Sequence, residues 1–158
     1  RNPSLVIEVI EAAGVPKTLV DAAVEKKRDS DRRRRRHQED AYDEVWAVFD
    51  RDEHPLFAEA CQKALENQVR LAVSNPSFEL WLLLHLQEHT APLDRHQARR
   101  SLSAHDPTYD KHVDFELYAP GLDAACARAR ELDRRAREGK TDGNPTTRVH
   151  ELVESLRT

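Results

Sequence analysis

Three carboxylates are spaced so that together they could hold a divalent cation. Asp50 and Asp52 follow directly on the apolar run 45–49, and Glu79 follows a second apolar run, 69–73. Asp50 and Asp52 lie two residues apart, so in extended backbone they point to the same side. Two like charges held this close repel unless a cation lies between them, and oxygen ligands suit Mg2+ or Mn2+. These residues predict a metal site at the carboxyl end of a strand.

A reading without metal stays open for each carboxylate. Asp50 would then end the strand and Asp52 would cap the next helix, although a cap needs only one aspartate. Glu79 would interact favourably with the dipole at the start of its helix. However, a carboxylate on an otherwise apolar helix should have a cation or hydrogen-bond donors as partners. The sequence therefore allows both a metal site and two helix starts.

The elements that must position these residues alternate along the chain. Apolar patterning predicts strands over 5–10, 45–49 and 69–73, the second buried on both faces. Helices are predicted over 18–27 and 56–65, and a third, buried helix is predicted after Asn75, which would cap it. This order is typical of a parallel α/β sheet with right-handed crossovers, flanked by helices, which binds ligands at the carboxyl ends of its strands.

The second half of the chain is predicted to be helical. Apolar stripes predict helices over 92–104, 122–137 and 147–156, so residues 90–158 would form a helical part packed on a core of residues 1–89, in a single domain. Tyr109 and Lys111, in a polar connector, could bring a phenol and an ammonium group to a phosphate, but a surface turn explains them equally well. The last helix is predicted to begin at 144–147 with a threonine cap.

Residues 30–40 contain five consecutive arginines, Arg32 to Arg36, and no apolar residue. This composition predicts a solvated loop. A run of arginines could also bind a nucleic-acid backbone through counterion release. The net charge of −4 argues that such binding would be local.

One short motif indicates a different chemistry. The segment from His85 to His89 matches the H-x-x-E-H pattern, in which two histidines one helical turn apart bind zinc and Glu88 acts as the base. A third ligand would have to be an acid such as Glu151 or Glu154. The alternative is that His85 ends an apolar helix at the edge of the core. A zinc peptidase is therefore a further alternative function.

Composition narrows the class of protein. Thirty-four per cent of the 158 residues are charged, and no apolar stretch is long enough to span a membrane. The cysteines, Cys61 and Cys126, fall on apolar helix faces and are predicted to be buried thiols, so we expect a cytoplasmic location. The sequence contains no methionine, so we expect it to begin inside a longer protein. The sequence is compatible with a homo-oligomer as well as with a monomer.

Four blocks of residues carry a resemblance to a known family. The blocks are 49–55 (FDRDEHP), 74–85 (SNPSFELWLLLH), 109–111 (YDK) and 144–147 (NPTT). In this order they resemble the RloB-like proteins, a family similar to Toprim domains. The resemblance implies a Toprim-like fold and a cytoplasmic phage-defence nuclease that acts on DNA or RNA and is often encoded beside an ATPase partner. A noncatalytic partner module of that ATPase is the alternative.

The resemblance also implies roles for individual residues. Asp50 and Asp52 match the Asp-x-Asp pair that holds Mg2+ or Mn2+ in Toprim sites. The accompanying glutamate, in a Glu-Gly context, does not precede the predicted strand 5–10. It is expected either to lie in a missing amino-terminal segment or to be absent from this chain. Glu79 would be a further ligand or the base that orients water, with His85 supporting it. The expected phosphate contacts are those of Asn75, Tyr109 and Lys111.

Overall fold

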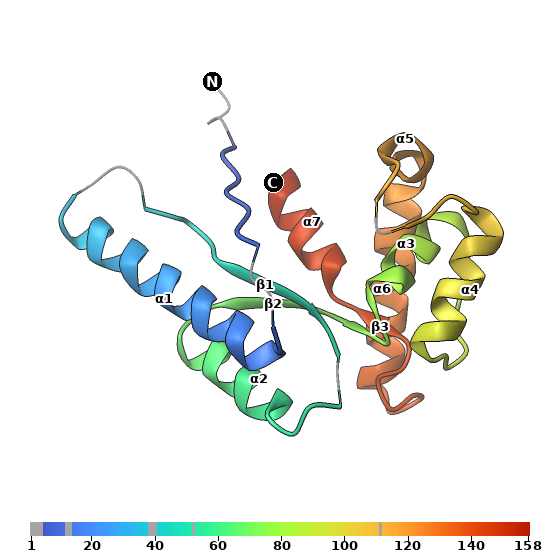
Figure 1. Cartoon of the computed structure of the whole chain (residues 1–158), viewed down its shortest axis with the longest axis horizontal. Helices are drawn as coiled ribbons and strands as arrows, with labels where there is room; N and C mark the ends of the chain where they lie inside the picture. Colours follow the sequence, from blue (N-terminus) through green and yellow to red (C-terminus); the bar gives the residue numbers. More distant parts are fainter. Residues whose placement is uncertain (1–4, 12–13, 38–40, 52, 111) are drawn as a thin grey trace. The chain divides into compact units, whose positions relative to one another are not determined.

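The computed structural model describes residues 5–11, 14–37, 41–51, 53–110 and 112–158 of the chain. These residues form a mixed α/β arrangement in which helices flank one three-stranded sheet, ordered β1-β2-β3 (Figure 1). The elements are α1 (Pro16–Arg35), β1 (Trp46–Asp50), α2 (Phe57–Glu66), β2 (Arg70–Asn75), α3 (Phe78–Leu86), α4 (Arg95–His105), α5 (Phe115–Tyr118), the 3-10 helix η1 (Ala119–Gly121), α6 (Leu122–Arg137), β3 (Thr146–Thr147) and α7 (Val149–Arg157). Within the described ranges, no helix has the length and apolarity that a membrane crossing requires.

β1 and β2 run parallel, as predicted. Arg70 N donates to Val45 O at 2.9 Å at one end, and Arg51 N donates to Ser74 O at 2.7 Å at the other, so residue numbers rise together along both strands. β1 is the edge strand of the sheet, and its Val48 is 45% exposed. The prediction that this strand is buried on both faces is therefore wrong, since only alternate residues point into the core.

The third strand of the sheet was not predicted. β3 pairs antiparallel with β2, with Ser74 opposite Thr147 and Asn75 opposite Thr146, so the expected all-parallel sheet is wrong at this strand. Residues 146–147 were predicted to start the last helix, but α7 begins at Val149. The buried hydroxyls of Ser74 and Thr147 lie 2.8 Å apart and satisfy each other, which favours the strand over an earlier helix start.

The chain divides into two compact units. The first consists of Arg1–Ala47, Glu53–Leu71 and Leu152–Thr158, and the second of Val48–Asp52 and Ala72–Glu151. A core over 1–89 with a helical part over 90–158 in one domain stays a prediction.

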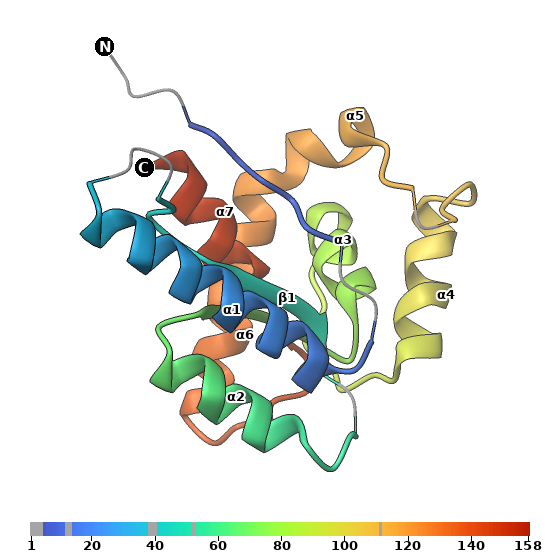
Figure 2. The same cartoon turned by 60° about the vertical axis from the view of Figure 1, so that its left-hand side comes forward.

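In the first unit, α1 and α2 run side by side (Figure 2). Val20 and Val24 of α1 and Ala60 and Ala64 of α2 are buried, which is the apolar patterning that predicted both helices. Lys63 Nζ donates to Asp21 Oδ1 at 2.6 Å and links the two.

α1 is longer than the predicted helix 18–27 and includes most of the arginine run, so the prediction of a solvated loop from residue 30 is wrong through Arg35. Arginine is a good helix former, and positive charge in the last turn complements the helix dipole. Ser30 is fully buried, and its hydroxyl accepts from Tyr42 N at 2.7 Å. These contacts favour helix over loop here.

The predicted strand over 5–10 is not observed. Residues 5–11 form neither helix nor strand, and their apolar side chains are exposed, Val6 by 86% and Val9 by 81%. A strand gains stability from hydrogen bonds to a neighbouring strand. The apolar composition of this segment alone therefore did not determine its structure.

In the second unit, α3 packs on both α4 and α6 (Figure 1). The side chains from Glu79 to Leu84 are all buried, which confirms the prediction of a buried helix. At Gly121 a Cβ atom would lie 2.1 Å from the carbonyl oxygen of His85, so only glycine lets η1 approach α3 this closely. This packing places the first turn of α3 beside the ends of β1 and β2, where the candidate site lies.

Candidate functional site

Asp50 is the last residue of β1, and its carboxylate meets the first turn of α3. Asp50 Oδ1 accepts a hydrogen bond from Phe78 N at 2.8 Å. Ser77, at the N-cap position of α3, makes no side-chain capping bond, so Asp50 supplies an acceptor from another element. A negative charge here also complements the helix dipole. Asp52, its predicted partner, lies outside the described residues.

Glu79 is buried in the same turn and meets Tyr109. The Glu79 side chain is 5% exposed, and Tyr109 Oη donates to its Oε1 at 3.4 Å. Burial first, and then the charge and hydrogen bond of Glu79, raise the pKa of Tyr109 to about 12, with a further contribution from the charge of Asp50. Tyr109 is therefore a neutral donor at neutral pH. It is buried, so the alternative of a surface turn is wrong for this residue.

Helix α4 contributes two arginines near the site, one that faces Asp50 and one that faces Asp110. Arg95 Nη2 lies 3.9 Å from Asp50 Oδ2, and Arg99 Nη2 lies 3.6 Å from Asp110 Oδ1. The charge of Arg99 acts on Tyr109 as well, because it opposes the rise in the pKa of that phenol. Sequence reasoning missed both arginines. Their four-residue spacing beside the buried Leu102 was the available signal, since it puts them at the border of the apolar stripe.

A second cluster of polar and aromatic side chains lies between α3, α4 and α5. Tyr118 Oη donates to Asp106 Oδ2 at 2.7 Å, and this bond is the main cause that lowers the pKa of Asp106. The His85 ring packs edge-on against Trp81 and Tyr118, with ring centres 4.7 and 5.8 Å apart. His85 therefore packs within this aromatic cluster. Its predicted role in support of Glu79 stays a prediction.

The protonation of His85 follows from its contacts. Its Nδ1 lies 2.9 Å from Trp81 O, and because a carbonyl only accepts, Nδ1 carries the proton. Burial lowers the pKa of His85. The imidazole is thus neutral at neutral pH, with Nε2 as its acceptor nitrogen.

The other predicted phosphate ligands have different positions. Asn75 ends β2, and its Nδ2 donates to Gly143 O at 2.7 Å. The prediction that Asn75 caps α3 is wrong, because Ser77 occupies the N-cap position. The amide of Asn75 instead joins β2 to the connector that leads into β3. Lys111 lies outside the described residues.

The H-x-x-E-H segment is not a continuous helix. α3 ends at Leu86, and Gln87 is extended, with φ −153° and ψ 162°. His85 and His89 consequently do not lie one helical turn apart, which the zinc motif requires. Among the described residues, which exclude Asp52, no group of three or more His, Cys, Asp and Glu side chains could hold a metal ion.

The part of the site that suits a metal consists of oxygen donors. Asp50 and Glu79 come from β1 and α3, and both of their charges act on the single hydroxyl of Tyr109. Carboxylate oxygens without histidine or cysteine suit Mg2+ or Mn2+ rather than zinc. Asp50 and Glu79 therefore offer ligand atoms of the type that such an ion prefers, and a Mg2+ or Mn2+ site that also includes Asp52 stays a prediction.

Comparison with known proteins gives one match. No curated protein and no solved structure matches the chain. A family model described as RloB-like protein matches residues 3–156, which includes both carboxylates, Tyr109 and the two arginines of α4. Because the match covers nearly the whole sequence, the chain belongs to the RloB-like protein family.

Proposed function

We propose that this chain is a Toprim-like, metal-dependent nuclease that hydrolyses phosphodiester bonds. The observation that carries the proposal is that Tyr109 donates to the buried Glu79 and also feels the charge of Asp50, while Arg95 lies 3.9 Å from Asp50. Carboxylates at the carboxyl end of parallel strands are in the position where open α/β sheets bind ligands. The guanidinium groups of Arg95 and Arg99 near this site suit a phosphate.

Each residue has a distinct role in this proposal. Asp50 and Asp52, with Glu79, would hold Mg2+ or Mn2+, which when bound polarises a phosphodiester and stabilises the departing oxygen. Glu79 accepts a proton from the attacking water or orients it. Tyr109 donates a hydrogen bond to Glu79 and keeps its carboxylate in place. Arg95 and Arg99 bind the non-reacting phosphate oxygens, as guanidinium groups commonly do.

The biological setting is proposed from the resemblance of the chain to the RloB-like proteins. We propose a role in phage defence in the cytoplasm, with DNA or RNA as substrate and an ATPase as partner protein. The alternative, a noncatalytic module of that ATPase, has the same family membership but requires no intact carboxylate pair.

Metal binding tests the site without reference to activity. Isothermal calorimetry of the full chain with Mn2+, Mg2+ and Zn2+ should show binding of Mn2+ that Asp50→Asn and Asp52→Asn each weaken at least tenfold. Glu116→Gln, which changes an exposed carboxylate of α5, is the matched control and should bind like the wild type. Zinc binding that depends on His85 and His89, and not on Asp50, would instead support a peptidase.

Nuclease activity is then assayed with single- and double-stranded DNA and RNA. We expect cleavage that requires Mn2+ or Mg2+ and that Glu79→Gln reduces by about two orders of magnitude or more, as for loss of a general base. Metal binding without cleavage of any of these substrates, together with stable association with an ATPase, would refute the nuclease and favour the noncatalytic module.

A further inference from the structure

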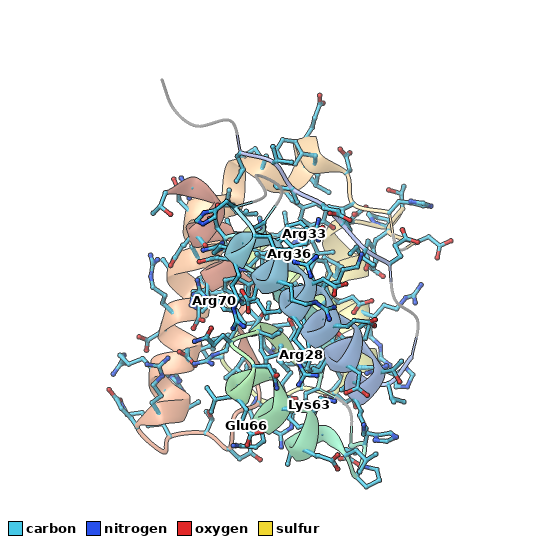
Figure 3. The ribbon with its side chains drawn as sticks, turned by 90° about the vertical axis from the view of Figure 1, so that its left-hand side faces the viewer. Arg28, Arg33, Arg36, Lys63, Glu66 and Arg70 are labelled. Carbon is cyan, nitrogen blue, oxygen red and sulfur yellow. The ribbon has the colours of Figure 1, made fainter. Side chains whose placement is uncertain are left out.

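The last turns of α1 carry a concentrated positive charge. Residues 28–36 include six arginines and two aspartates, a net charge of +4, in a chain whose net charge is −4. We call four of these arginines, Arg28, Arg32, Arg33 and Arg36, the arginine face. The four-residue spacing of Arg28, Arg32 and Arg36 puts them on one side of the helix. Figure 3 shows Arg28, Arg33 and Arg36 on α1. Arg32, Arg33 and Arg36, together with Asp29, line an open hollow of about 450 Å³.

The contacts of the arginine face orient its side chains without neutralising most of them. Arg28 Nη2 donates to Asn67 Oδ1 at 3.1 Å, and the Arg33 guanidinium lies 5.6 Å from the centre of the Tyr42 ring. Arg32 pairs with Asp29. Arg28 and Arg36 are exposed, and no ion pair between described residues joins Arg28, Arg33 or Arg36 to a carboxylate.

The surroundings of the arginine face favour a polyanion over an apolar partner. Val20 and Val24 of α1 are buried and its Leu19 is half-buried, so this helix has no exposed apolar side to insert into a membrane. Residues 28–36 contain no aromatic or aliphatic side chain of the kind that anchors protein interfaces. Guanidinium groups match phosphate oxygens in a forked geometry.

The spacing along the helix suits a ligand with repeated phosphates. Arg28, Arg32 and Arg36 follow each other at four-residue steps, which is about 6 Å per step along the helix axis. All three are exposed. A single small anion would meet one or two of these side chains, whereas an extended phosphodiester chain can meet all of them.

We propose that the arginine face binds the sugar-phosphate backbone of a nucleic acid, without reading its sequence. This inference deepens the proposed nuclease function, on which it rests for its biological meaning, because it names a surface outside the carboxylate site that holds the substrate. Binding of this kind is driven by counterion release and weakens steeply with salt. It requires no metal ion.

The test is fluorescence anisotropy of a labelled oligonucleotide with the full chain in EDTA, over a range of salt concentrations. The variant Arg28→Gln/Arg32→Gln/Arg36→Gln should lower the slope of log affinity against log salt by about 2 to 3, and affinity on the order of a hundredfold near 0.1 M salt. Arg36→Gln alone should lower the slope by about 0.7 to 0.9. Arg36 closes α1 at its exposed end, so this single variant keeps the test valid if the triple variant does not fold.

The matched control changes the same formal charge on another helix. Arg130→Gln/Arg134→Gln/Arg137→Gln removes three exposed arginines from α6, and Arg134 and Arg137 already pair with acids there. This control should keep most of the affinity. Equal losses in both triple variants would overturn the proposal, because net charge would then explain the binding.

Two further outcomes separate this proposal from others. Binding of anionic lipid vesicles or of polyglutamate as tightly as the oligonucleotide would overturn it in favour of a membrane or an acidic protein. Because the assay contains EDTA, it measures binding of the oligonucleotide separately from cleavage. Loss of cleavage with retained binding would therefore concern only the nuclease site, and loss of binding in the arginine variants only the arginine face.

Discussion

The contact between Asp50 and the first turn of α3 predicts how two substitutions differ in stability. Asp50 Oδ1 accepts from Phe78 N at 2.8 Å, and the side chain is 34% exposed. Asp50→Asn keeps an acceptor oxygen and loses the charge, so the main loss is the favourable interaction with the helix dipole, about 0.5 kcal/mol. Asp50→Ala loses the acceptor too and should cost about 1 to 2 kcal/mol of unfolding free energy.

Arg95 adds little to either value. Its guanidinium is 3.9 Å from Asp50 Oδ2, and both side chains are partly exposed, so solvent screens the pair. For a chain of this length, 1 kcal/mol corresponds to roughly 2 to 4 °C in Tm. We expect Tm to fall by about 2 °C or less for Asp50→Asn and by roughly 2 to 8 °C for Asp50→Ala.

Urea denaturation followed by circular dichroism measures both free energies. Asp110→Ala is the control, since Asp110 also faces an arginine of α4 but is 89% exposed, and it should change stability by about 0.5 kcal/mol or less. If Asp50→Asn is as unstable as Asp50→Ala, the hydrogen bond to Phe78 is not the source of the stabilisation. If Asp50→Asn stays stable and loses Mn2+, the carboxylate has a binding role separate from its structural one.

Three further predictions concern the core, a close backbone approach and acid. Ser74→Ala should cost about 1 to 3 kcal/mol of unfolding free energy, because it leaves the buried hydroxyl of Thr147, 2.8 Å away, without that partner. Adding Thr147→Val to this variant should cost little more in the same denaturation assay. Gly121→Ala should cost about 1 to 3 kcal/mol of unfolding free energy, since its Cβ would lie 2.1 Å from His85 O. Gly139→Asn is the control and should change Tm little, because Gly139 has φ +70° and open space around it. Equal effects of the two substitutions would contradict the packing of Gly121 on α3. Burial holds the pKa of His85 below 6.5, so the unfolded chain takes up a proton first as the pH falls. The free energy of unfolding should therefore decrease on acidification below pH 6.5. A His85→Phe variant with the same pH dependence would show that His85 is not responsible.

Local sequence patterns predicted the elements whose own residues form a regular apolar face. The helix predicted over 122–137 has these bounds as α6, and α2, α4 and the buried helix α3 differ from their predictions mainly at the ends. Strand β1 was predicted within one residue. Prediction from periodicity succeeds here because each element buries a continuous apolar stripe or run, which is visible in the order of its residues.

The errors share a physical cause, which is stabilisation by residues distant in the sequence. Tyr42 lies beside the end of α1 and bonds Ser30, so a helix forms where composition indicated a loop. Segment 5–10 has strand composition but no neighbouring strand. Residues 146–147 form β3 because β2 offers them a partner, although their own sequence suits a helix start.

The sequence by itself determined the alternation of helices and strands, the family, and the residue types of the candidate site. Only the tertiary structure decided which groups those residues meet: Asp50 meets Phe78 across 28 residues, and Glu79 meets Tyr109 across 30. It also buried Tyr109, excluded a helical turn shared by His85 and His89, and placed the arginines of α4 beside the acids. The reason is that periodicity reports the side an element buries, whereas a hydrogen bond between elements depends on how the chain folds back on itself.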